Sequence, residues 1–88
     1  MWVVTRTDEK RLVNLDTCRY VSVRGGSIGT RQIVTMQSEG EEPIVLADCE
    51  SEYQADVLFQ RLVLALQNEA TFLDLTKDPE AEGYGEAR

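Results

Sequence analysis

The side chains that could do acid–base or metal chemistry in this chain are carboxylates and thiols, because the chain contains no histidine. That absence excludes Ser–His and Cys–His nucleophile pairs and removes the commonest metal ligand. Asp48, Glu50 and Glu52 form the pattern D-x-E-x-E, but this segment has neither the glycine turn nor the ligand spacing of a calcium loop. Their place at the start of a predicted helix, where carboxylates complement the helix dipole, explains them. We therefore expect a protein that is not an enzyme and has no metal and no cofactor.

The two cysteines, Cys18 and Cys49, make neither a disulfide framework nor a zinc site. Cys49 precedes a predicted helix start, an environment that lowers a thiol pKa, but no base or resolving thiol accompanies it. We expect both to be small apolar residues at strand ends. The glycine-rich segment 25–30 lacks the Lys-Ser/Thr pair of a phosphate loop and precedes a strand pattern, so we expect no nucleotide or other small-molecule substrate.

Charge is unevenly distributed along the chain, whose formal net charge is −7. Residues 1–37 hold six basic against three acidic residues, or +3, whereas residues 38–88 hold three against thirteen, or −10. Arg19, Arg24 and Arg31 form a basic cluster around the glycine-rich hairpin that is too sparse for a nucleic-acid site, so we expect no direct nucleic-acid contact. The acidic half either serves solubility or meets a basic surface, such as the hairpin of a second copy.

One segment is long and periodic enough to predict a helix, from Glu52 to Ala70. Ser51 and Gln54 form a capping box, in which the serine accepts from the Gln54 N–H and the glutamine reaches back to the cap. Turning each residue by about 100° gathers an apolar stripe that should face the core. The stripe consists of Ala55, Leu58, Phe59, Leu62, Ala65 and Leu66, with Val63 at its margin.

The opposite side of the predicted helix carries a second set of apolar residues, Tyr53, Val57 and Leu64, beside Arg61. Isolated surface apolar residues are common and need no partner. The alternative is a contact face, which would meet another subunit, a partner protein or a later piece of the same chain. These four residues are the predicted interaction site.

The remaining chain predicts short strands separated by tight turns. We expect five strands, at 2–5, 11–15, 18–24, 31–37 and 43–47, and either a sixth strand or an extended segment at 71–75. The predicted fold is α+β, an antiparallel, strongly curved β-meander covered by one long C-terminal helix. Residues 1–75 should form a single domain and residues 76–88 a disordered acidic tail.

A chain of 88 residues lies near the lower limit for a self-sufficient hydrophobic core, so oligomerisation would add useful burial. The sequence has no apolar run of about 20 residues and no signal-peptide pattern at its start. We therefore expect a cytoplasmic protein that does not contact a membrane.

The opening W-V-V-T-R, the following R-L-V-N-L-D and the strand before S-E-x-x-A and its helix resemble a group of short uncharacterised proteins encoded by bacteria and their phages. The likeness covers residues 1–75. Val4-Thr5-Arg6 and Asn14-Leu15-Asp16 are also similar to the FlbD/SwrD flagellar proteins, but the long second half and the missing Pro-Asp-Thr turn depart from that pattern. The resemblance implies a bacterial or phage origin and brings no catalytic residues.

These features predict a non-enzymatic protein–protein interaction module that self-associates as a homodimer or binds a protein partner. The alternative is an acidic phage inhibitor of the anti-CRISPR or anti-restriction type, which would imitate the phosphate charge of DNA.

Overall fold

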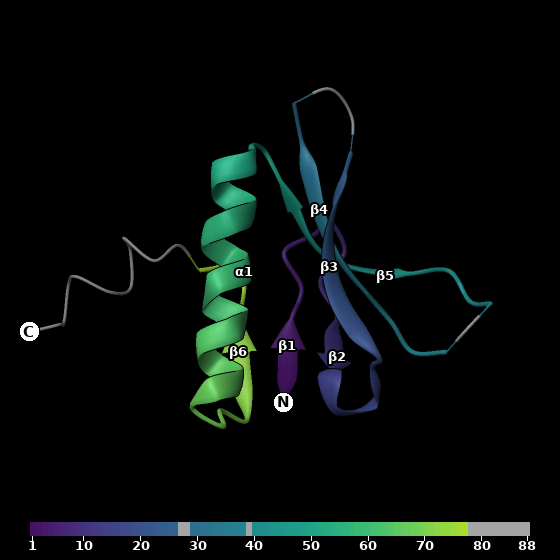
Figure 1. Ribbon diagram of the computed structural model, residues 1–88, viewed down its shortest axis with the longest axis vertical. Helices are drawn as coiled ribbons and strands as arrows, with labels where there is room; N and C mark the ends of the chain where they lie inside the picture. The colour runs from purple at the N-terminus through teal and green to yellow at the C-terminus, as the bar shows by residue number, and fades with distance from the viewer. Residues whose placement is uncertain (27–28, 39, 78–88) are drawn as a thin grey trace, which may run out of the picture.

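Two small three-stranded sheets and one α-helix make up the residues that the computed structural model describes, which are 1–26, 29–38 and 40–77 (Figure 1). The predicted α+β class is confirmed. Most of the predicted tail, from residue 78 onward, lies outside the described residues. In chain order the elements are β1 (Trp2–Val4), β2 (Leu12–Asn14), the 3₁₀ turn η1 (Leu15–Thr17), β3 (Tyr20–Gly25), β4 (Arg31–Met36), β5 (Ile44–Cys49), α1 (Glu52–Gln67) and β6 (Phe72–Asp74).

The first sheet has β1 at its centre, between antiparallel β2 and parallel β6. Hydrogen bonds from Trp2 N–H to the Thr71 carbonyl (2.9 Å) and from Leu75 N–H to the Val4 carbonyl (3.1 Å) continue the β1–β6 pairing at both ends. A parallel pair needs a long crossover, and here that crossover is the second sheet and the helix. The first strand is therefore bound to the last strand of the described chain.

The predicted single five-stranded meander is wrong, because only β3, β4 and β5 form an antiparallel meander in one sheet. The first two predicted strands instead make a separate sheet with the predicted sixth strand. The reason is that β1 is only three residues long and the chain leaves it for the other sheet immediately afterwards. The strand positions agree with the prediction within a few residues, and so do the antiparallel pairs β1–β2, β3–β4 and β4–β5. The predicted pairing of the second strand with the third is absent from the described residues, and β1 pairs with β6 instead.

Arg6 joins the two sheets through its backbone. Its N–H donates to the Leu46 carbonyl (2.8 Å), and its carbonyl accepts from the Asp48 N–H (2.9 Å), a parallel bridge to β5. On the other edge of β5 a register shift beside Ile33 and Val34 inserts one extra residue, and such bulges bend a strand. The two sheets are consequently joined along β5.

The helix α1 begins as predicted but ends earlier, at Gln67 rather than Ala70. Ser51 Oγ accepts from the Gln54 N–H (3.1 Å), while the Gln54 side chain accepts from the Glu50 N–H (2.8 Å), one residue before the cap. At the other end Glu69 adopts a positive φ of 57°. The Ala70 N–H then bonds the Ala65 carbonyl and the Glu69 N–H the Leu66 carbonyl, which together form a Schellman motif that stops the helix.

The core lies between the helix and the two sheets, and its helical part is Ala55, Leu58 and Leu62. Phe59 and Ala65 pack against it while partly exposed. The prediction that Leu66 faces the core is wrong, since Leu66 is 51% exposed. Its angle on the helix suits the stripe, but it lies in the last turn, one residue before the helix ends.

Candidate interaction surfaces

The predicted helix surface divides into an exposed part and a part engaged within the chain. Tyr53 is 78% exposed and Leu64 is 54% exposed, as a contact face requires. Val57 and Arg61 are half-buried. Arg61 donates through Nη1 to the Lys77 carbonyl (2.6 Å) and through Nη2 to the Asp74 carbonyl (3.3 Å). At Arg61 the helix therefore meets a later piece of the same chain, one of the three occupants expected for this face.

The later piece is a tightly bonded segment, Asp74 to Lys77. Leu75 is completely buried, and Arg6 Nη1 donates to the carbonyls of Leu75 and Thr76, both at 3.2 Å. Asp74 Oδ1 accepts from the Thr76 hydroxyl (2.5 Å) and the Thr76 N–H (2.9 Å). These bonds, with that of the hydroxyl foremost, lower the pKa of Asp74. The first two residues of the predicted tail are thus held by the fold.

The first sheet exposes an apolar surface that we call the outer sheet face, formed by Trp2, Val4, Leu12 and Phe72. Trp2 lies beside Phe72 in the register of β1 and β6, and Val4 lies beside Leu12 in that of β1 and β2. Because side chains alternate along a strand, these residues point away from Val3, which is fully buried. Trp2 is 48%, Leu12 59% and Phe72 54% exposed. Two aromatic rings and a leucine therefore gather on the solvent side of three short strands.

The outer sheet face does not follow from any local pattern in the sequence. The alternation of W-V-V predicts that Trp2 and Val4 share a side, but no local signal places Phe72 next to Trp2, from which it is separated by 70 positions. Only the parallel pairing of β1 with β6 brings them together.

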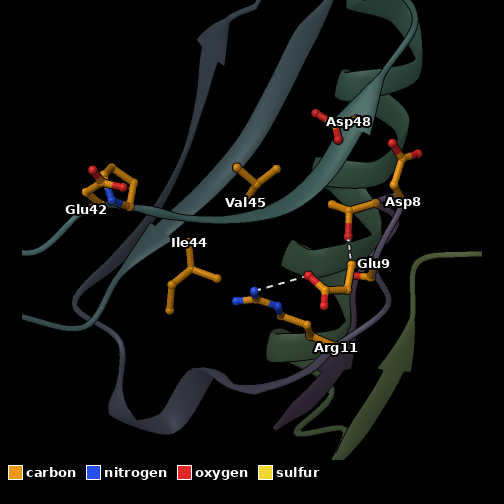
Figure 2. A pocket seen from close by; sticks show the side chains of 9 residues that line it. Asp8, Glu9, Arg11, Glu42, Ile44, Val45 and Asp48 are labelled. Atoms are coloured by element: carbon orange, nitrogen blue, oxygen red, sulfur yellow. Dashed lines mark hydrogen bonds and ion pairs between the residues drawn. The ribbon is translucent and has the colours of Figure 1, made fainter.

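An acidic hollow of 480 Å³ lies between the β1–β2 turn and β5 (Figure 2). Figure 2 shows Glu42 at one end and Asp8 and Asp48 at the other, with Ile44 and Val45 on the wall between them. The fourth carboxylate, Glu9, accepts an ion-pair hydrogen bond from Arg11 at 3.4 Å, and both side chains are exposed. Such a lining suits a cationic side chain with an aliphatic stem.

The basic cluster predicted around the hairpin is partly bonded within the second sheet. Arg24 Nε donates to Gln32 Oε1 (3.0 Å), and Gln32 Nε2 donates to Asp48 Oδ1 (2.8 Å), a polar row across β3, β4 and β5. Arg31 is half-buried and donates to the Thr30 carbonyl (2.8 Å). The arginines consequently do not form one open cationic surface.

Both cysteines are unpaired thiols. Cys49 is 2% exposed, and burial raises its pKa, an effect that outweighs the favourable charge of Arg6. A helix N-terminus can lower a thiol pKa, but for Cys49 desolvation is the larger effect.

No protein-family model, curated protein or solved structure matches this chain. Over residues 1–26, 29–38 and 40–77, no three Cys, Asp or Glu side chains converge so that they could hold a metal ion. The α-helix of the described chain is too short and too polar to cross a membrane.

Proposed function

We propose that the chain is a non-enzymatic protein–protein interaction module of the bacterial cytoplasm, encoded by a bacterium or a phage, which works as a homodimer. The observation that supports it best is the outer sheet face. Aromatic residues that are exposed side by side have no role in the core of this domain, and they are enriched at the centres of protein interfaces.

The outer sheet face has the composition of an interface centre with a polar rim. Trp2 and Phe72 are each about half exposed. Asn14 lies beside Trp2 and Asp74 lies beside Val4 on the same face of the sheet. Burying aromatic surface yields roughly 25 cal/mol per Å², and a few such anchors carry most of the energy of an interface. A protein partner would cover these rings. Tyr53 and Leu64 of the helix, which are also exposed, are a second contact surface in this proposal.

The proposal is tested by capture with three forms of the full chain: wild type, Phe72→Ser and Leu66→Ser. Phe72 and Leu66 have similar exposure, 54% and 51%, but only Phe72 belongs to the outer sheet face. Some captured proteins should be retained by the wild type and by Leu66→Ser but released by Phe72→Ser. Each of these is purified, and its Kd for all three forms of the chain is measured. We expect Phe72→Ser to raise the Kd about tenfold or more and Leu66→Ser to leave it within about twofold. Equal retention of every protein by all three forms would contradict the proposal.

The acidic hollow supports the second candidate, an inhibitor that imitates the phosphates of DNA. Its four carboxylates surround an apolar wall, which favours a basic partner. Binding to a purified nucleic-acid enzyme should then weaken steeply with salt and be lost in the double variant Asp8→Asn and Glu42→Gln. A salt-insensitive complex that needs Phe72 would decide against this candidate.

A further inference from the structure

The strand β3 has an open edge in the part of the chain that the structure describes. In the order β3-β4-β5 it pairs only with β4. Natural edge strands are usually protected by brevity, charged side chains, proline, bulges or a covering element, and of these β3 has one charged side chain, Arg24. β3 has six residues, no proline and a regular register with β4, and its pattern is largely exposed. Figure 1 shows the β3–β4 hairpin extending beyond the first sheet and away from the helix.

The hydrogen bonds of the hairpin determine which backbone groups face the open edge. Gly26 N–H donates to the Thr30 carbonyl (3.2 Å), which continues the register of Arg24 with Gln32. Hydrogen-bonded pairs recur at every second residue of an antiparallel ladder, so Tyr20, Ser22 and Arg24 direct their backbone groups toward β4. The Tyr20 carbonyl accordingly also accepts from the Thr35 hydroxyl of β4 (2.6 Å). The N–H and C=O groups of Val21 and Val23 therefore point outward.

We propose that β3 pairs with β3 of a second copy, antiparallel about a twofold axis at Ser22, and joins the two meanders into one six-stranded sheet. This inference rests on the self-association in the proposed function and names its interface. A twofold interface must be self-complementary, and this one is. Val21 lies opposite Val23 of the second copy, and Val23 lies opposite Val21 of the second copy. The outward N–H and C=O groups of both residues are therefore paired in both copies.

The side chains select this register among those that the backbone allows. With the axis at Ser22, Tyr20 lies opposite Arg24 of the second copy in a non-hydrogen-bonded pair, where facing side chains are closest. Arg24 is exposed and donates from Nε to Gln32 Oε1, and Tyr20 is 47% exposed. Each pair can therefore form a cation–π contact, and the dimer contains two. An axis at Val21 or Val23 loses both contacts.

The test is the sedimenting mass of the full chain against concentration, for the wild type and for Tyr20→Arg, Arg24→Tyr and the double exchange. Tyr20→Arg places two arginines opposite each other and should raise the dimer Kd about tenfold or more, while the double exchange should restore it to within about threefold. Gln67→Arg, which adds the same charge at an exposed helix position, should leave the Kd unchanged.

Amide hydrogen exchange tests the same interface in the wild type, so this experiment does not require any variant to fold. On raising the wild-type concentration, exchange at Val21 and Val23 should slow at least tenfold, while Ser22, already bonded to β4, should change little. Two results would overturn the β3 interface without contradicting self-association. One is a dimer in which Val21 and Val23 still exchange fast. The other is a dimer that Leu64→Glu disrupts and Tyr20→Arg does not. A wild type that stays monomeric at every concentration would overturn both. Protection that appears only with a captured partner protein would assign the edge to another chain's strand and overturn the inference.

Discussion

Trp2 lies directly beside Phe72 in the parallel pairing of β1 and β6, and both rings point to solvent. The pairing fixes the two ends of the described domain to each other, since β1 opens the fold and β6 closes it. Its inward residues, Val3 and Leu73, belong to the core or pack against it. One pair of strands therefore supports the fold on one face and presents the candidate contact surface on the other.

The helix phase is tested by a matched pair of leucine truncations. Leu62 is 2% exposed and Leu64 is 54% exposed on the same helix. Leu62→Ala should reduce the free energy of unfolding by about 2–5 kcal/mol, because it removes buried contacts and leaves a cavity. Leu64→Ala should change it by less than about 0.5 kcal/mol. Urea unfolding measures both. A Leu62→Ala loss under about 1 kcal/mol would show that Leu62 is not central to the core.

Arg61 should stabilise the segment that follows β6. It donates to the Asp74 carbonyl in a partly buried bond and to the Lys77 carbonyl in an exposed one. Hydrogen bonds of charged groups contribute about 1.5–3 kcal/mol, and we expect the partly buried bond to Asp74 to contribute most. Arg61→Ala should lower the urea midpoint and increase proteolytic cleavage after Asp74, while Gln60→Ala, at an exposed neighbouring position, should do neither. Wild-type cleavage in Arg61→Ala would mean that Leu75 and Arg6 hold the segment without it.

Glu69 is a site where a single change should stabilise the fold. It occupies the left-handed position of the Schellman motif with a φ of 57°, which glycine adopts without steric cost. Glu69→Gly should raise the free energy of unfolding by about 0.5–1 kcal/mol, and Glu69→Val should lower it. Thermal unfolding of the two variants against wild type checks the order. The reverse order would contradict the helix end described here.

The turn at Asp74 and Thr76 should make stability depend on pH in the acid range. The pKa of Asp74 lies below its usual 3.8, chiefly because of the Thr76 hydroxyl. Since folding favours the ionised carboxyl, its contribution is complete above the unfolded-state pKa and is lost as pH falls through the folded-state value. Thr76→Val should raise the Asp74 pKa toward the usual value, and its stability deficit against wild type should shrink below about pH 4. NMR titration of Asp74 measures the shift directly, and identical titration curves would refute this role of Thr76.

The sequence predicted what local spacing determines. The Ser51 cap and the Ala55, Leu58 and Leu62 stripe depend on residues three or four apart, and the structure has them. The strands were predicted from alternation and turns, which act over a few residues. Two connections join segments that are distant in the sequence. One is the pairing of β6 with β1, which are strands of three residues each, and the other is the bridge from the single residue Arg6 to β5. No local pattern encodes either of them.

The same difference between local spacing and distant pairing applies to the candidate contact surfaces on the helix and on the first sheet. Tyr53 and Leu64 were predicted from helical periodicity and are exposed. The bonds of Arg61 to Asp74 and Lys77 were foreseen only as one of three alternatives, because a helix pattern does not say which segment returns to it. The outer sheet face was missed, because it exists only once Phe72 has been placed beside Trp2.

Trp2 is the single tryptophan of the chain, and this makes the central claim directly measurable. The chain is labelled with 5-fluorotryptophan and titrated with an unlabelled protein that wild type retains in the capture experiment, and the one ¹⁹F resonance is followed. If the outer sheet face is the contact surface, the resonance should shift on binding, and Phe72→Ser should move the midpoint to about tenfold higher partner concentration. A Trp2 resonance that stays unchanged at saturating partner would contradict the account.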